Sequence, residues 1–220
     1  MSQWLSGKRL ALIGPTERLS HRAIEILNNN LNGKISYKEI DFSPFSGINV
    51  SEFLLTLDSD TVVSSKNVRF DWDFSPILQK KVFLKFVKFE NPYINFRKSL
   101  GDTLWNFEKI AKQSSDTTSS APPNLVIFLN NVQLENARFS MVDENDTTRM
   151  NTFNPSNFVA EHLNLKLGGK LSLHDKKYSV SIAELNFYEK KSSFAVTKCQ
   201  ADVFANDTNI DIQNFTLQTE

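Results

Sequence analysis

The chain has 220 residues, with 25 Lys plus Arg against 25 Asp plus Glu, and a single cysteine, Cys199. This length suits one large domain or two small ones, and the zero net charge provides no basic field for a nucleic acid backbone. One cysteine and three histidines exclude an internal disulfide and a thiolate zinc cage. The 18 Phe and 22 Asn residues favour many short strands joined by Asn-containing turns.

The N-terminal region contains one segment with a clear helical period. Apolar residues from Leu19 to Leu31 recur on one side, and Asn32-Gly33 provides a C-cap. We therefore expect an irregular N-terminus over 1–15 and an amphipathic helix over 16–31.

Beyond residue 34 the apolar period changes to two, which is typical of strands with one wet and one dry face. The phase slips several times, for example between Val50 and Phe53 and between Leu134 and Ala137, and each slip predicts a bulge. The sequence Leu-Gly-Gly-Lys over 167–170 predicts a hairpin turn. The prediction is a mainly β (α+β) fold, in which the helix packs at the end of a long, curved antiparallel sheet that forms an open hydrophobic groove.

The organisation along the chain predicts one helix-capped β domain over 16–220. A polar, low-complexity linker at 112–123 separates a first strand block (16–111) from a second (124–220). No apolar run is long enough for a membrane span. Because the final residues still alternate as a strand, we expect the chain to be a fragment of a longer protein.

So wide a sheet needs a cover for its apolar face, and a single helix covers only part of it. Either the sheet folds onto itself as a sandwich or barrel, or it forms an open trough that an apolar ligand fills. The first strand block supplies the candidate lining residues, which are core residues on the one reading and groove residues on the other: Val68, Phe70, Trp72, Phe74, Val82, Leu84, Phe86, Ile94 and Phe96.

Acidic and histidine pairs do not assemble a recognisable reactive site. Asp71 and Asp73 alternate with aromatic residues, which places both carboxylates on the wet face of a strand. The run 143–147 lacks the glycine and the terminal glutamate of a calcium loop, and Glu161-His162 and His174-Asp175 stand without any catalytic motif. We therefore expect no enzyme activity, no metal and no cofactor.

Several segments in the first half follow a familiar order: residues 16–27, 31–45, 48–55 and 74–82, then 90–95 leading into Gly-Asp-Thr-Leu-Trp-Asn-Phe at 101–107. This order resembles the N-terminal region of AsmA-like proteins, the group that includes the translocation and assembly module subunit TamB. The resemblance implies a protein of the bacterial cell envelope, on the periplasmic side of the inner membrane. It also implies lipid transfer or outer-membrane assembly through a hydrophobic β-groove.

The partners that this resemblance implies are a phospholipid or other acyl-chain lipid and an outer-membrane assembly protein, with no nucleic acid. In that family an apolar anchor normally precedes the first helix, whereas only the short stretch 9–14 stands in its place here. Membrane anchoring is therefore expected of the full-length protein and not of this chain. The alternative is a β-sandwich interaction module that binds a protein partner by its edge strand, without lipid.

Overall fold

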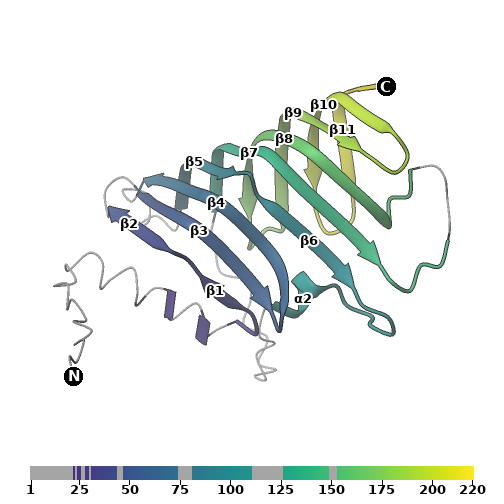
Figure 1. Ribbon diagram of the computed structural model, residues 1–220. Helices are drawn as coiled ribbons and strands as arrows, with labels where there is room; N and C mark the ends of the chain where they lie inside the picture. The colour runs from purple at the N-terminus through teal and green to yellow at the C-terminus, as the bar shows by residue number, and fades with distance from the viewer. Residues whose placement is uncertain are drawn as a thin grey trace, which may run out of the picture.

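The computed structural model describes residues 22, 24, 25, 28, 29, 31–43, 47–73, 81–110, 126–148 and 153–220. Figure 1 shows the strands lying side by side in one long, twisted sheet. The strands are β1 (Lys34–Ser36), β2 (Glu39–Ser43), β3 (Gly47–Leu57), β4 (Asp60–Asp73), β5 (Lys81–Glu90), β6 (Tyr93–Lys98), β7 (Val126–Asp143), β8 (Asn157–Ser172), β9 (Lys177–Glu189), β10 (Phe194–Ala205) and β11 (Ile210–Thr219). A short helix, α2 (Asn106–Ile110), lies between β6 and β7 in the chain. The prediction of a mainly β fold is confirmed.

The eleven strands occupy nine positions across the sheet. β1 and β2 follow one another along the same side of β3, and β5 and β6 follow one another between β4 and β7. From there the order continues β7, β8, β9, β10, β11. All these strands belong to one hydrogen-bonded sheet, so among the described residues there is no second sheet to form a sandwich.

The prediction of a wholly antiparallel sheet is wrong at one place. β7 runs parallel to both β5 and β6, with Phe89 opposite Leu134 and Ile94 opposite Phe139, whereas the other pairings are antiparallel. A parallel neighbour needs a crossover of a dozen or more residues, and the segment from 99 to 125 is long enough to provide one. Because alternation along a strand is the same for both directions, the sequence pattern could not reveal this pairing.

The hairpin predicted at residues 167–170 is also wrong, because β8 runs straight through it to Ser172. The two glycines instead permit close approach to neighbouring backbones. A Cβ atom on Gly168 would lie 3.1 Å from the carbonyl oxygen of Asn130, and one on Gly169 would lie 2.4 Å from that of Ser179. These glycines are therefore packing positions within a strand rather than turn residues.

Left-handed residues stand at both of the phase slips named above, and a register shift accompanies one of them. Glu52, between Val50 and Phe53, has a left-handed φ of 50°. Asn136, between Leu134 and Ala137, has a φ of 49°, and the register between β7 and β8 shifts there. At Asn136 one extra residue returns the following apolar side chains to the same face. At Glu52 the register between β3 and β4 does not shift, because Ser51 pairs with Asn67 and Phe53 with Ser65.

Two other predictions fall mainly outside the described residues. The linker 112–123 lies outside them entirely. Of the helix predicted over 16–31, the described positions 22, 24, 25, 28 and 29 have helical conformation. The side-chain amide of Asn28 donates to the Ile35 carbonyl at 3.0 Å and accepts from its N–H at 2.6 Å. An amphipathic helix packed on the sheet and an open groove both stay predictions.

Candidate functional site

The two faces of the sheet differ in chemistry, because side chains alternate along each strand and directly paired residues share a face. On one face, a line of residues without any charged side chain crosses nine strands. We call it the central row; from β2 to β11 it comprises Ile40, Val50, Val68, Phe89, Leu134, Leu165, Leu185, Cys199 and Leu217.

Two further rows lie beside the central row, and we call the surface made by all three the apolar face. The second row crosses the strands from β2 to β10: Phe42, Ile48, Phe70, Val87, Val132, Leu167, Ile182 and Ala201. The third row crosses those from β4 to β11: Trp72, Leu84, Leu129, Gly169, Val180, Val203 and Ile212. Apolar character thus continues from one end of the sheet to the other.

Burial within the apolar face varies with side-chain size and position. Val68 is buried, with Val50 and Phe89 on either side of it in the central row. Larger members such as Phe70 are only partly buried, and Ile212 on β11 is 57% exposed. The face therefore keeps solvent-accessible apolar surface, which in a soluble monomer is a common mark of a binding site.

A line of left-handed residues borders the central row, and we call it the bulge line. Glu52, Asn91, Asn136 and His162 have φ between 48° and 53°, and they lie in β3, at the join of β5 and β6, in β7 and in β8. The Asn136 amide donates to the Asn91 side-chain oxygen at 2.7 Å, while its own oxygen lies 2.9 Å from Nδ1 of His162. Side-chain hydrogen bonds thus link the bulges of three neighbouring strands.

Beyond the bulge line, the same face becomes aromatic. Ala137 and Phe139 return to the face of Leu134, because Ala137 pairs with Leu163, two residues from Leu165 along β8. From there a chain of ring contacts, with centroids 4.5 to 6.3 Å apart, crosses from β6 to β10. We call it the aromatic cluster; it comprises Phe107, Phe96, Phe139, Phe158, Phe153, Phe194 and Phe187.

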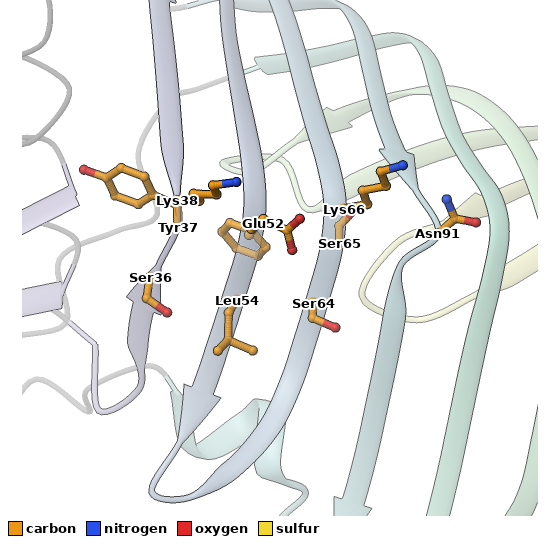
Figure 2. A pocket seen from close by; sticks show the side chains of 10 residues that line it. Ser36, Tyr37, Lys38, Glu52, Leu54, Ser64, Ser65, Lys66 and Asn91 are labelled. Carbon is orange, nitrogen blue, oxygen red and sulfur yellow. The ribbon is translucent and has the colours of Figure 1, made fainter.

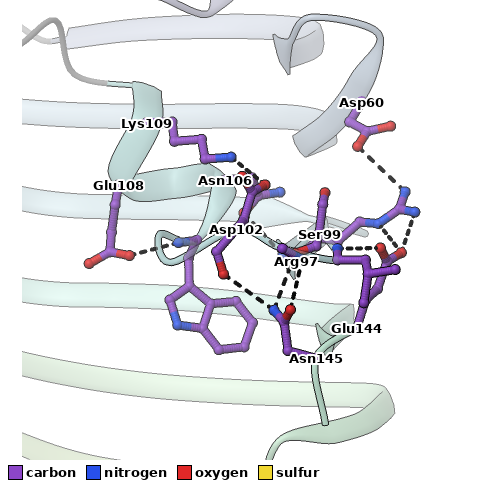
Figure 3. Close-up of polar contacts among 12 residues, drawn as sticks. Asp60, Arg97, Ser99, Asp102, Asn106, Glu108, Lys109, Glu144 and Asn145 are labelled. Carbon is purple, nitrogen blue, oxygen red and sulfur yellow. Dashed lines mark hydrogen bonds and ion pairs between the residues drawn. The ribbon is translucent and has the colours of Figure 1, made fainter. Parts of the chain in front are cut away.

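Phe107 of α2 is one end of this cluster, and Figure 3 shows the polar contacts that hold α2 and its loop. The Arg97 guanidinium binds the Glu144 carboxylate, which also accepts a 2.9 Å hydrogen bond from the N–H of Leu100. Asn106, buried at the start of α2, donates to the Asn95 carbonyl at 2.8 Å and accepts from the N–H of Arg97 at 3.1 Å. These contacts fix α2 so that Phe107 lies against the aromatic cluster.

The Glu144 carboxylate is the ionic centre of this arrangement. Its hydrogen bonds with Arg97 and with the N–H of Leu100 lower the pKa of Glu144, and the Arg97 pKa is raised in turn. The loop contacts therefore persist across the neutral pH range.

The opposite face is charged. Lys88 binds Glu135 at 2.9 Å and Glu90 at 3.2 Å, and Lys166 binds Glu184 at 2.7 Å. Hydrogen bonding to these carboxylates raises the pKa of both lysines. These strands therefore have one face suited to water and one suited to apolar contact.

Seven of the nine predicted lining residues share the aromatic and apolar side of the sheet. Val68, Phe70, Trp72 and Leu84 lie in the three rows, Val82 pairs with Ile127 beside them, and Ile94 and Phe96 pair with Phe139 and Met141. Phe74 lies outside the described residues.

Phe86 lies on the charged face instead. The register between β4 and β5 shifts next to Asp71, so Phe86 pairs with Asp71 and its ring lies under the Arg69 guanidinium, 5.6 Å from the ring centroid. Strict alternation from Val82 does not hold beyond Leu84, because the shift adds one residue to β5.

Sequence reasoning missed the contribution of the second strand block. The leucines and isoleucines of β7 to β9 in the rows carry the same alternation as β4, and that signal was available. Phe153 and Phe158 were not found, because Phe153 lies within the stretch from 143 to 157, whose polar composition indicates a loop, and Phe158 directly follows that stretch. Only the parallel pairing of β6 with β7 brings Phe96 against Phe139.

The sheet also has an open pocket of about 530 Å³ beside Glu52 and Asn91 of the bulge line, lined by residues of β1, β3 and β4. Figure 2 shows Lys38, Glu52, Lys66 and Asn91 following one another across it. Most of its lining residues have charged, amide or hydroxyl side chains, so the pocket suits an acyl chain less well than the uncharged rows do.

The acidic pair Asp71 and Asp73 and the histidine-containing pairs do not come together in one site. Asp71 binds Arg69 at 2.7 Å and Asp73 binds Lys85 at 3.3 Å. His174 lies 3.3 Å from Asp175 in an exposed turn, and His162 contacts Asn136. Within the described part of the chain, no three His, Cys, Asp or Glu side chains group as metal ligands would.

Comparison of the chain with protein-family models, with curated proteins and with solved structures finds no match. In the described part of the chain, no helix has the length and apolar character needed to cross a membrane.

Proposed function

We propose that this chain binds acyl-chain lipid along the apolar face, as the N-terminal part of an AsmA-like envelope protein that transfers lipid or assists outer-membrane assembly. The observation that carries the proposal is the central row, which crosses nine strands without a charged side chain.

The direction of the rows matches the shape of an acyl chain. Neighbouring strands lie about 4.8 Å apart, so a row over nine strands runs for about 38 Å perpendicular to them. Each methylene that leaves water contributes about 0.8 kcal/mol, and this gain is non-directional. A flexible chain can therefore lie along a row without any specific polar contact.

A lipid-binding sheet needs one hydrated face and one apolar face, and the two faces of this sheet differ in that way. Ion pairs such as Lys88 with Glu135 and Lys166 with Glu184 favour a hydrated opposite face. Partly buried side chains such as Phe70 offer apolar surface on the other side. The order of segments that resembles AsmA-like proteins supports the periplasmic side of the inner membrane as the place of action.

The test uses two phenylalanines on adjacent strands and opposite faces. Phe70 lies in the second row, whereas Phe86 lies under Arg69 on the charged face. We expect mass spectrometry to detect phospholipid in organic extracts of the purified chain. The amount of bound phospholipid should fall at least tenfold in the Phe70→Asp variant and stay unchanged in the Phe86→Asp variant.

Urea unfolding of both variants provides the control for folding. Because Phe70 is only partly buried, an aspartate at this position stays partly hydrated. The substitution should therefore lower the free energy of unfolding by less than a charge placed in a closed core would. Absence of lipid from the unsubstituted chain, or equal loss in both variants, would contradict the proposal.

A further inference from the structure

The loop between β6 and α2 exposes large apolar side chains. Leu100 is 77% exposed, Leu104 is 40% exposed and Phe107, in α2, is 39% exposed. Trp105 lies between them in the chain, with its ring centroid 6.4 Å from that of Phe107. We call these four side chains the apolar tip. Exposed apolar side chains that gather in this way mark a surface that contacts a partner or a membrane.

The conformation of the loop is fixed by residues that follow β7. The N–H of Leu100 donates to Glu144 at 2.9 Å, and the N–H of Gly101 donates to the side-chain oxygen of Asn145 at 2.8 Å. The Asn145 amide in turn donates to the Ser99 carbonyl at 3.2 Å (Figure 3). These bonds satisfy backbone groups that would otherwise need water, so the loop can enter an apolar surrounding at low cost. They also hold the apolar tip in place before any contact is made.

The two lysines beside the apolar tip form ion pairs. Lys98 binds Asp143 at 2.7 Å and Lys109 binds Asp102 at 2.5 Å. The Lys98 ammonium also lies 5.4 Å from the centroid of the Trp105 ring. Tryptophan is enriched at the membrane–water interface, and a long lysine side chain there keeps its ammonium among the headgroups. The surroundings of the apolar tip therefore suit the interface of a bilayer.

The apolar tip is continuous with the apolar face through the aromatic cluster. The Phe107 ring lies 4.5 Å from Phe96, and Phe96 lies 5.3 Å from Phe139, between ring centroids. Phe139 shares the face of Leu134 in the central row. An acyl chain that moves from the tip to the rows therefore meets apolar side chains along its way. Because contact of methylenes with water is unfavourable, this path lowers the cost of drawing a lipid out of a bilayer.

We propose that the apolar tip inserts into the interface of a phospholipid bilayer and holds the chain there while lipid passes between the bilayer and the apolar face. This inference rests on the proposed function, which requires a bilayer as the source or the destination of the lipid. A protein interface normally includes about ten direct hydrogen bonds, whereas a bilayer needs none of fixed geometry. The paired lysines and satisfied backbone of the loop therefore favour the bilayer.

The test is flotation of the chain with neutral phosphatidylcholine vesicles. We expect the chain to float with the vesicles equally at about 0.1 M and about 1 M salt, because apolar insertion is not screened. The double variant Leu100→Asp with Leu104→Asp should lower the bound fraction at least tenfold. The control Tyr188→Asp, at a residue 38% exposed that pairs with Glu161, should float as the unsubstituted chain does. Because these side chains are exposed, urea unfolding should show that all the variants stay folded.

A soluble fatty acid, offered below its micelle concentration, separates this inference from the proposed function, because its binding needs the apolar face and no bilayer. The double variant should bind the fatty acid normally but extract labelled phospholipid from vesicles at least tenfold more slowly. Phe70→Asp should lose the fatty acid and still float. A chain that binds the fatty acid without floating, or a double variant that floats or extracts lipid normally, would overturn the inference and leave the proposed function intact. A chain that floats through the tip but binds no fatty acid would support the bilayer contact and contradict the proposed function.

Discussion

The side-chain amide of Asn136 donates a 2.7 Å hydrogen bond to the side-chain oxygen of Asn91, 45 positions away in the chain. Both residues have left-handed backbone, with φ of 49° and 48°. Backbone bonds flank the pair: the N–H of Asn91 donates to Glu135 at 2.9 Å, and the N–H of Arg138 donates to Pro92 at 2.8 Å. The bulge of β7 is therefore locked to the break between β5 and β6.

This relationship predicts a difference between two substitutions at Asn136. Asn136→Gly and Asn136→Val both remove the bonds to Asn91 and His162, but only glycine tolerates the left-handed backbone without cost. We expect the valine variant to be less stable than the glycine variant by about 1–2 kcal/mol in urea unfolding. Equal stabilities would show that the bulge relaxes when the side chain changes.

A second prediction concerns the close backbone approach at Gly169. A methyl group there would lie 2.4 Å from the Ser179 carbonyl oxygen, so β8 and β9 must separate. We expect Gly169→Ala to cost about 1–3 kcal/mol of unfolding free energy. The matched variant is Gly101→Ala, where the new methyl meets open space and only the left-handed φ of 81° opposes it. If Gly101→Ala proved the more costly of the two, close packing at β8 would not be the reason for the glycine.

A third prediction concerns acid stability. Hydrogen bonds from Thr148, together with those from the Asn154 and Asn157 amides, lower the pKa of Asp146 to about 2. A carboxyl with a folded-state pKa below its unfolded value stabilises the fold above the unfolded pKa and loses this effect as the pH falls through the folded one. We expect unfolding free energy to fall between about pH 4 and pH 2, and to fall less steeply in Asp146→Asn. Identical slopes would contradict the role of this carboxylate.

The sequence predicts strand content and bulges well, because alternation and its phase slips report directly on which face a side chain occupies. The slip between Leu134 and Ala137 locates the bulge at Asn136. Strand direction could not be predicted in this way. Alternation is the same in parallel and antiparallel sheets, so the sequence of β7 does not indicate that its neighbours β5 and β6 are parallel to it. The glycines at 168 and 169 misled for a related reason, since glycine serves turns and close backbone contacts alike.

The candidate site was predicted in part. Val68, Phe70 and Trp72 lie on one face because the register shift beside Asp71 adds its extra residue to β5 and not to β4. Phe86 was misplaced because a register shift depends on both strands, and a single strand's pattern does not contain it. The aromatic cluster depends on residues from β6, α2, β7 and beyond, which only the fold brings together.

The most direct test of the central claim is photocrosslinking of the chain to a fatty acid with a photoreactive group in its tail, followed by peptide mapping. On β8, Leu165 and Leu167 lie in the apolar rows, whereas Lys166 between them pairs with Glu184 on the charged face. We predict adducts on Leu165 and Leu167 and on their row partners, with a period of two along the strand and none on Lys166. Adducts spread over both faces, or confined to the polar pocket at Glu52 and Lys66, would contradict lipid binding along the apolar face.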